Sequence, residues 1–366
     1  MPDELLYQLA LHFIPRIGPV QTKILVDHFH NASDIFKAKK SQLEKIEGIG
    51  EVKAKSILSF TDFDKAEEEL LFVEKFKITP LFINDKNYPK RLLNCFDPPV
   101  LLFYKGNTDL NTSKIITVIG TRNNSDYGKQ ITEKLIKDLS VYNAVIVSGL
   151  AFGIDAIAHK AALKNNLQTI GVLAHGLDKM YPQEHTSLAK EMVLHGGLIT
   201  EFNSKTKPDK HNFPTRNRIA AGMSDATIVV ETGLKGGSMI TAELANGYNK
   251  DVFAFPGKIT DAKSAGCNYL IKNNKAILLT EAKEIVELLN WDEQSKTKIK
   301  KQRELFIELS ANEKIIINIL KQKDSVHIDE LNIKSNLNSS LVAASILNLE
   351  LQNVIISLPG KMYKIC

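Results

Sequence analysis

The sequence is poor in cysteine, with three in 366 residues: Cys95, Cys267 and Cys366. They lie too far apart for a zinc-binding cluster, and they provide no disulfide framework. No apolar run approaches the ~20 residues that a membrane-spanning helix needs. The first residues, "MPDELLYQLALHF", carry early acidic side chains, unlike a secretory signal. We therefore expect a cytoplasmic protein without a metal cluster or membrane insertion.

The sequence also lacks a strong excess of positive or negative charge. It contains 47 Lys and Arg residues and 42 Asp and Glu residues, which gives a net charge of +5. Many enzymes carry as much, so the total does not identify a partner. The distribution is more informative. Two segments are basic. Ser204–Arg218 contains five Lys and Arg residues and one Asp, and Lys296–Arg303 contains five Lys and Arg residues and no acid. The second run is typical of a solvated linker with some attraction for phosphates.

The chain is long for one domain, and its hydrophobic fraction of 43% is that of an ordinary globular protein. We expect four segments. They are a helical, helix-hairpin-helix-like (SAM-like) domain at 1–78, a Rossmann-like domain with its lead-in at 79–290, a basic linker at 291–309, and a winged-helix-like domain at 310–366.

Two similar pieces occur within residues 1–78, "IPRIG" at 14–18 and "IEGIG" at 46–50. Apolar residues recur around them at three- and four-residue steps, which predicts helices without strands. The pieces resemble degenerate helix-hairpin-helix motifs, whose backbone N–H groups face a DNA phosphate. The alternative is a small helical bundle in which the glycines only turn the chain. The sequence leaves both open.

Strands and helices are predicted to alternate from Lys114 to Asn290, after a connector at 88–107 that prolines interrupt. The predicted strands are continuous apolar runs, as expected where helices cover both faces of a parallel sheet. They lie at 115–119, 144–148, 169–173, 197–201, 226–231, 251–255 and 276–279. The fold class is therefore α/β, with a Rossmann-like, doubly wound and largely parallel sheet.

Residues 310–366 predict three helices followed by two short strands around a Pro-Gly turn, which is a winged-helix pattern. The third helix of such modules often reads DNA. However, Asn336–Asn353 contains no Lys or Arg, and its only charge is Glu350. Packing or protein contact is therefore favoured over DNA reading for this helix.

The first predicted strand ends in Gly120, Thr121 and Arg122, and the further glycines of a dinucleotide-binding fingerprint are missing. Other predicted strands also end in loops with glycines, hydroxyls and cations, which suit phosphate oxygens. Ligands of open sheets bind at this edge. We predict an elongated polyanion site, without a bound cofactor. Its candidate residues are Gly120, Thr121, Arg122, Ser148, Gly149, Lys205, Lys207, Lys210, Phe213, Arg216, Asn217, Arg218, Gly236, Gly237, Ser238 and Thr241.

Single residues of this set have plainer alternatives. Arg122 has Asp126 as a possible ion-pair partner in its own turn. Phe213 either stacks on a nucleic-acid base or anchors its loop as a core aromatic. Asp155 is expected to brace the turn before its helix, and His159 to be packed. Only the convergence of several loops favours the polyanion site.

Seven motifs in order resemble the DNA-processing protein A family, also called Smf or DprA. They include "VIGTRNNSDYG", "VSGLAFGIDAIAHKAAL", "FPTRNRIAAGMSDATIVVE" and "GGSMITAELA". The similarity is close over roughly residues 88–289. The chain departs from the family pattern after Tyr181-Pro182, where many relatives have an asparagine and a basic residue. A DNA contact from that loop is therefore left open.

The resemblance implies a cytosolic bacterial protein that binds single-stranded DNA during natural transformation. Such proteins protect the incoming strand and help to load a RecA-type recombinase on it, as homodimers formed through the α/β domain. The DNA-contacting arginine of the family matches Arg122, and its basic position before the Phe-Pro-x-Arg-Asn-Arg motif matches Lys210. Arg216 and Arg218 match the arginines of that motif.

An enzyme is the main alternative. "KGGSMITAE" resembles the Gly-Gly-x-Gly-Thr-x-x-Glu signature of phosphoribohydrolases, in which the glutamate, here Glu243, acts at the sugar. However, Met239 replaces the third glycine, and no nucleophile–base pair is evident. We therefore expect no catalytic residue and no enzymatic activity. A further alternative is a scaffold protein that binds DNA only incidentally.

Overall fold

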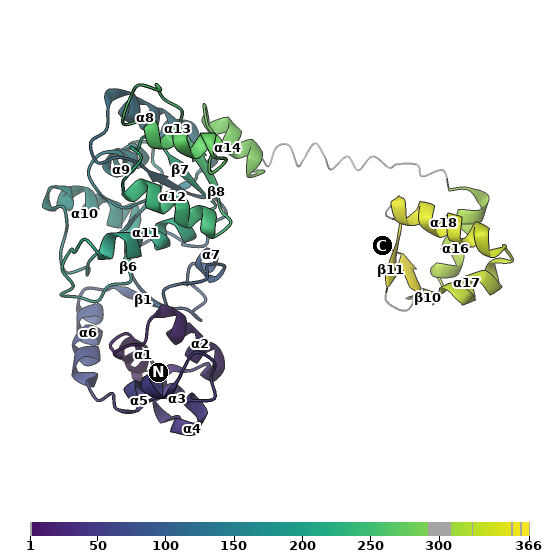
Figure 1. The fold of residues 1–366 in the computed structure, drawn as a ribbon, viewed down its shortest axis with the longest axis horizontal. Helices are drawn as coiled ribbons and strands as arrows, with labels where there is room; N and C mark the ends of the chain where they lie inside the picture. Colours follow the sequence, from purple (N-terminus) through teal and green to yellow (C-terminus); the bar gives the residue numbers. More distant parts are fainter. Residues whose placement is uncertain (1, 292–308, 324, 353, 359–360, 366) are drawn as a thin grey trace. The chain divides into compact units, whose positions relative to one another are not determined.

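The computed structural model, drawn as a ribbon in Figure 1, describes residues 2–291, 309–323, 325–352, 354–358 and 361–365. Contacts divide the chain into two units, Met1–Trp291 and Asp292–Cys366. The basic run Lys296–Arg303, and all of the expected linker except residues 291 and 309, lie outside the described residues.

The first unit begins with a helical domain. Its helices are α1 (Pro2–Leu11), α2 (Pro19–Phe29), α3 (Ala32–Lys37), α4 (Lys40–Leu43), α5 (Glu51–Leu58) and α6 (Phe63–Lys75). Gly18 and Gly50 directly precede α2 and α5. Gly48 has a φ of 84°, a left-handed conformation that suits glycine. The prediction of helices without strands before residue 79 is confirmed for the described residues.

A sheet forms the centre of the first unit. Its strands are β1 (Thr79–Phe82), β2 (Leu101–Gly106), β3 (Ile115–Ile119), β4 (Val145–Ser148), β5 (Thr169–Val172), β6 (Gly196–Thr200), β7 (Ala226–Val229), β8 (Asp251–Ala254) and β9 (Ile277–Leu278). Their spatial order is β1-β2-β6-β5-β4-β3-β7-β8-β9. Neighbours from β6 to β9 in this order are parallel, which confirms the predicted doubly wound, largely parallel sheet.

Helices cover both faces of this sheet (Figure 1). One face packs against α8 (Asp126–Leu139), α9 (Ile154–Lys164) and α14 (Ala282–Leu288). The other packs against α11 (Asn212–Gly222), α12 (Gly237–Gly247) and α13 (Ala265–Lys272). Residues of β3 alternate between these cores, because neighbouring side chains of a strand point to opposite faces. His159 of α9 is fully buried beside Thr169, with 2.6 Å between Nδ1 and Oγ1, which confirms its packed role.

Several elements differ from the sequence prediction, among them β1, which no predicted strand covered. The connector at 88–107 contains α7 (Lys90–Leu93) and β2, and β2 pairs antiparallel with β1 and β6. The basic segment after β6 contains α11, which the prediction treated as a loop. Pro214 is the third residue of α11, where the missing N–H of proline costs nothing because no intrahelical acceptor exists. The shorter connections are the 3₁₀ turns Ser140–Tyr142 and Gln183–His185, the latter before α10 (Thr186–Leu194).

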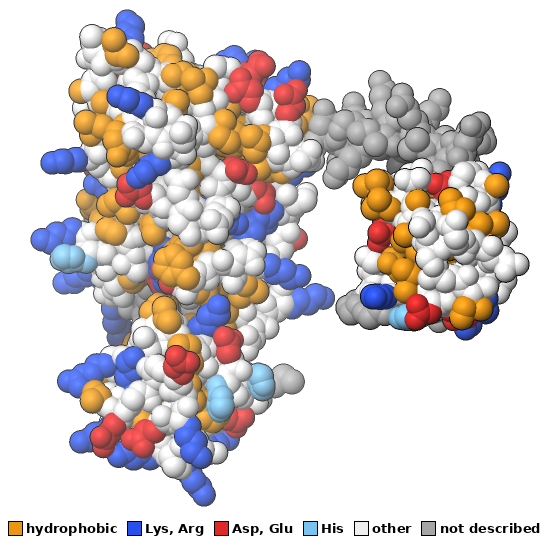
Figure 2. Space-filling model, turned by 45° about the vertical axis from the view of Figure 1, so that its right-hand side comes forward, with side chains coloured by type: hydrophobic (Ala, Val, Ile, Leu, Met, Phe, Trp, Pro, Cys, Tyr) orange, Lys and Arg blue, Asp and Glu red, His pale blue; other side chains and the backbone are white. Residues whose placement is uncertain are grey.

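The second unit is a winged-helix domain. Its elements are α16 (Ala311–Leu320), β10 (Val326–His327), α17 (Ile328–Ser335), α18 (Ser339–Leu351), β11 (Ile355–Leu358) and β12 (Met362–Ile365). The prediction of three helices and a hairpin is confirmed, and β10 adds a third strand beside β12. Hydrophobic side chains are exposed on this unit (Figure 2), and Leu347 and Leu351 of α18 are among the exposed residues.

The junction of β2, β5 and β6 depends on glycine. A Cβ on Gly196 would lie 1.9 Å from the carbonyl oxygen of Thr169 in β5, and a Cβ on Gly197 would lie 2.4 Å from the Tyr104 ring. The Tyr104 hydroxyl in turn donates to the Gly196 carbonyl at 3.1 Å. Small residues in β6 therefore allow the antiparallel edge to pack against the parallel strands.

We expect Gly196→Ala to lower the free energy of unfolding of the first unit by about 1–3 kcal/mol, the usual cost of forcing extra atoms into a packed core. Gly247→Ala is the matched control, because no atom lies within 4 Å of a Cβ at that position. Urea denaturation followed by circular dichroism measures both. Equal stability of the two variants would contradict the packing described here.

Candidate functional site

The strand order of the sheet reverses at β3, which lies between β4 and β7. The loops at the carboxyl ends of β3 and β7 diverge there, and open α/β sheets bind ligands at such a switch point. A pocket of about 440 Å³ lies at this position, and we call it the switch-point pocket. It is lined by Ile119, Gly120, Thr121, Arg122, Gly149, Ala151, Asp155, Phe213, Arg216, Asn217, Ala220, Thr232, Gly233, Lys235, Gly236, Gly237, Ser238 and Thr241.

A second pocket of about 500 Å³, the outer pocket, adjoins the first. Arg122, Phe213, Asn217 and Gly237 line both. The remaining lining of the outer pocket comprises Tyr181, Pro208, Asp209, Lys210, Pro214 and Ile240. The two pockets therefore form one elongated depression, built from turns that are far apart in the sequence.

Arg216 lies on the inner side of this depression and is only 4% exposed. Its guanidinium donates to the backbone carbonyl oxygens of Gly149 and Val172, and its Nε donates to Oδ1 of Asn217 at 3.0 Å. Neutral acceptors hold the side chain in place without cancelling its charge.

The charge of Arg216 is incompletely balanced. None of the ion pairs found among the described residues includes Arg216 or Arg122. Burial lowers the pKa of Arg216 to about 10, which still leaves it charged at neutral pH. Asp155 is the acid in the lining of this pocket, and burial raises the pKa of its carboxyl. The switch-point pocket therefore has a surplus of positive charge.

Two guanidinium groups lie close to the ring of Phe213. Its ring centroid is 5.2 Å from Cζ of Arg122 and 5.9 Å from Cζ of Arg216, which are favourable cation–π distances. The Tyr181 ring lies 6.1 Å away on the side of the outer pocket. Phe213 is half-buried, so part of its ring surface remains open. It brings two like charges close together, and an anion bound between them would relieve their repulsion.

A buried acid fixes the turn that carries Arg122. The carboxylate of Glu231, 1% exposed, accepts hydrogen bonds from the Ser125 backbone N–H at 2.8 Å and from the Ser125 hydroxyl at 2.6 Å. The Glu231 carbonyl accepts from the Thr121 N–H at 2.6 Å. Ser125 also caps α8 by accepting from the Gly128 N–H at 3.1 Å. These bonds tie the β3–α8 turn to the end of β7.

Two glycines let the neighbouring turns approach closely. Gly153 has a φ of 76°, and a Cβ there would lie 2.3 Å from the Thr121 carbonyl oxygen. A Cβ on Gly149 would lie 2.5 Å from Nη1 of Arg216. Asp155 accepts from the N–H groups of Gly149 at 3.2 Å and Ala151 at 3.4 Å, which confirms that it braces this turn.

The N-terminus of α12 contributes the opposite wall. Gly236 caps this 11-residue helix, and Lys235 is exposed directly before it. The first N–H groups of a helix lack intrahelical partners and favour anions. The Ser238 hydroxyl donates to Oγ1 of Thr232 at 2.7 Å, and Asn217 donates to the Gly237 carbonyl at 3.2 Å. The wall therefore combines a helix terminus with a lysine.

Most of the sequence-predicted site residues come together in this depression. Those that line one or both pockets are Gly120, Thr121, Arg122, Gly149, Lys210, Phe213, Arg216, Asn217, Gly236, Gly237, Ser238 and Thr241. The alternative ion pair between Arg122 and Asp126 is not formed.

Two predicted residues are buried in structural roles. Ser148 is fully buried, and its hydroxyl donates to the Val118 carbonyl at 2.6 Å. Arg218 is 7% exposed, pairs with Glu201 and donates to the Asp97 carbonyl. Residues two apart on a helix point to opposite sides, so α11 directs Arg218 away from the pockets that Arg216 lines.

Two predicted lysines lie outside both linings. Nζ of Lys205 pairs with Glu68 of α6 at 2.5 Å, so this lysine connects the loop after β6 to the helical domain. Lys207 is exposed and lines neither pocket. Neither residue is part of the depression.

The candidate set left out Lys235, although it lies in a loop that the prediction used. The prediction missed Tyr181 as a lining residue and Glu231 as the residue that positions the Arg122 turn. The signal for Lys235 was its place before the paired glycines after β7. Nothing in the sequence marked Tyr181 as a neighbour of Phe213, because they lie on separate loops. In the sequence, Glu231 could not be distinguished from any other acidic residue at the end of a strand.

The acid of the enzyme alternative lies elsewhere. Glu243 is exposed on α12, lines neither pocket and pairs with Lys275 at 3.4 Å. Among the residues that the structure describes, no three His, Cys, Asp or Glu side chains are grouped to hold a metal ion. No helix in the described ranges has the length and apolar character needed to cross a bilayer.

Three family models match the chain. "DNA recombination-mediator protein A" matches residues 79–290, "Helix-hairpin-helix motif" matches residues 6–70, and "DprA winged helix domain" matches residues 305–361. A curated relative, DNA processing protein DprA of Bacillus subtilis, is 43% identical over 206 residues, which are 56% of this chain and 69% of the relative.

Two solved structures are similar at 33% sequence identity. DNA processing protein A of Streptococcus pneumoniae aligns with a TM-score of 0.68 over 77% of this chain and 97% of that chain. DNA processing protein A of Helicobacter pylori, described for its unique single-stranded DNA binding mode, aligns with a TM-score of 0.54 over 59% of this chain and 97% of that chain.

We expect Glu231→Gln to lower the free energy of unfolding by about 1–3 kcal/mol, because a buried group that accepts several hydrogen bonds loses its charge and part of its acceptor capacity. Glu243→Gln is the control, since an exposed pair contributes about 0–1 kcal/mol. Urea denaturation of both variants measures the difference. A loss no larger than that of the control would show that Glu231 does not hold the turn.

Proposed function

Because the chain belongs to the DNA recombination-mediator protein A family, also called DprA or Smf, we propose that it binds single-stranded DNA during natural transformation. The strand would lie in the switch-point and outer pockets. The relative from Helicobacter pylori, described for its single-stranded DNA binding mode, supports this choice of ligand.

One observation carries the proposal: the buried Arg216 and the exposed Arg122 both lie at cation–π distance from the Phe213 ring, and neither has a carboxylate at ion-pair distance among the described residues. A buried charge that is only partly balanced costs stability, and an anionic ligand would offset that cost. Lys235 and Lys210 extend the positive charge to either pocket. Several cations along one depression suit a chain of phosphates better than a single one.

The shape of the site supports a single strand over a duplex. Pockets of about 440 Å³ and 500 Å³ are of the size that holds small molecules, so they admit unpaired nucleotides. A base stacked on Phe213 requires an unpaired ring face, and such stacking tolerates every base. We therefore propose binding with little sequence preference, in which Phe213 contacts a base.

The wider role follows the family. We propose that the protein is cytoplasmic, acts as a homodimer, protects the incoming strand and loads a RecA-type recombinase on it. The exposed Leu347 and Leu351, on a winged-helix segment without Lys or Arg, support a protein contact for α18. We further propose that it is a DNA-binding protein without catalytic activity. The position of Glu243 outside both pockets supports this.

We expect Arg122→Glu to weaken single-strand binding roughly 100-fold, because an attractive charge beside Phe213 becomes a repulsive one. Lys137→Glu is the matched control: it makes the same charge change at an exposed position of α8 that lines neither pocket. Fluorescence anisotropy with a labelled oligothymidylate measures both. If both variants bind as the parent does, the pockets are not the binding site.

We also expect the parent to bind single strands more tightly than duplex, and the logarithm of its affinity to fall linearly with that of the salt concentration. The slope should be about −0.7 per phosphate contacted. Anisotropy titrations across a salt series measure it. A slope near zero, or a preference for duplex, would contradict binding in these pockets.

We expect no free base to be released when the protein is incubated with nucleoside monophosphates, because Glu243 lies outside the pockets. Chromatography of the reaction detects released base. Release by the parent that Glu243→Gln abolishes would establish the phosphoribohydrolase alternative instead.

A further inference from the structure

A third and larger hollow of about 1,400 Å³ lies along α10. We call it the α10 groove, and its lining includes Lys105, Phe152, Tyr181, Lys190 and Leu194. Large apolar side chains are unusually exposed in it: Phe152 is 44% exposed, Tyr181 48% and Leu194 67%. Exposed apolar surface on this scale, rimmed by polar side chains, usually marks an interaction site.

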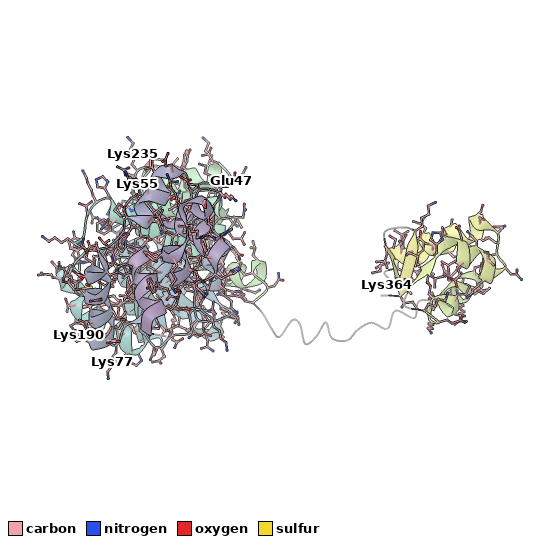
Figure 3. The ribbon with its side chains drawn as sticks, turned by 90° about the horizontal axis from the view of Figure 1, so that it is seen from below. Glu47, Lys55, Lys77, Lys190, Lys235 and Lys364 are labelled. Atoms are coloured by element: carbon pink, nitrogen blue, oxygen red, sulfur yellow. The ribbon has the colours of Figure 1, made fainter. Side chains whose placement is uncertain are left out.

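The α10 groove is continuous with the outer pocket. Tyr181 and Pro208 line both, and the Tyr181 ring lies 6.1 Å from that of Phe213. Because the outer pocket shares four residues with the switch-point pocket, the three hollows form one path. The ends of this path are far apart. In Figure 3, Lys235 of the switch-point pocket and Lys190 of the α10 groove lie at opposite edges of the first unit and point outward.

The charge of the α10 groove suits a polyanion. Three lysines line it, Lys105, Lys179 and Lys190, against the acids Asp178 and Glu184. Asp178 is already engaged, since it accepts the Lys205 N–H at 3.0 Å and lies 3.8 Å from Nζ of Lys179. None of the ion pairs among the described residues includes Lys105 or Lys190. Nζ of Lys105 lies 5.9 Å from the centroid of the Phe76 ring, whereas Lys190 is exposed, so Lys190 is the lysine best placed to meet a phosphate.

The aromatic side chains suit bases. Three aromatic side chains line the path. Phe213 lines the switch-point and outer pockets, Tyr181 lines the outer pocket and the α10 groove, and Phe152 lines the α10 groove. Phe152 is supported from behind by the buried His185, whose ring centroid is 5.0 Å from its own. Proteins that bind single strands combine such stacking rings with lysines that follow the backbone. A peptide would not need the lysines, so the combination favours nucleic acid.

The geometry points to the α10 groove as the continuation of the DNA site: the strand leaves the outer pocket across Tyr181, stacks a base on Phe152 and places a phosphate near Lys190. This inference rests on the proposed function. It predicts that the bound strand is longer than the two inner pockets require, and that nucleotides beyond them add affinity.

The test compares the parent, the double variant Phe152→Ala/Lys190→Glu, and the control Val141→Ala/Lys137→Glu. The control makes the same kinds of change at exposed positions outside all three hollows, since Val141 is 78% exposed. Oligothymidylates of ~4 and ~16 nucleotides serve as probes, because OB-fold modules that bind single strands occupy this range. We expect the groove variant to bind the longer probe roughly tenfold more weakly, with binding of the shorter probe and the urea midpoint unchanged.

Each other result overturns the inference in a distinguishable way. If the parent binds neither probe, both the proposed function and this inference are wrong. If the groove variant binds the longer probe as the parent does, the strand does not enter the groove and the proposed function stands. If that variant instead loses only binding to a RecA-type recombinase, the groove is a protein-docking surface. If the groove variant and the control lose the same affinity for the longer probe, the effect comes from the change in net charge and not from the groove.

Discussion

The site depends on a buried positive charge that no carboxylate contacts at ion-pair distance among the described residues and that Asp155 balances only in part. Arg216 is held by carbonyl oxygens and by Asn217, and the exposed Arg122 lies at cation–π distance from the same ring, that of Phe213. Neutral acceptors fix the direction of a guanidinium but leave its field in place. The arrangement is costly for an empty pocket and favourable for one that contains an anion. The proposed DNA binding follows from this single imbalance.

The sheet makes the imbalance possible. Its order reverses at β3, so the loops after β3 and β7 diverge and leave the carboxyl ends of the strands open. Glu231 ties the Arg122 turn to β7, and Gly149 lets the guanidinium of Arg216 approach the backbone. The cations of the pockets therefore come from turns and from α11, which meet only after the whole sheet has formed. Interactions within one turn could not assemble them.

Much of this was predictable from the sequence, because apolar runs fix the order of strands and a parallel sheet brings their ends to one edge. The position of Arg122 after β3 followed from that rule alone. Arg216 and Arg218 could not be separated, because the segment was taken for a loop and only the helical geometry of α11 turns them apart. The antiparallel strand β2 was not predicted, because prolines precede it and the segment was read as a connector. The contact between Tyr181 and Phe213 is tertiary, so no local sequence pattern encodes it.

Hydrogen exchange of the full chain with and without a single-stranded oligonucleotide tests the central claim most directly. The claim is that turns distant in sequence jointly bind one strand of DNA. We expect slowed exchange to appear jointly at Gly120–Arg122, at Gly149–Gly153 and at the start of α12, at the same oligonucleotide concentration. Protection confined to the helix-hairpin-helix domain or to the winged-helix unit, with these three turns unchanged, would contradict it.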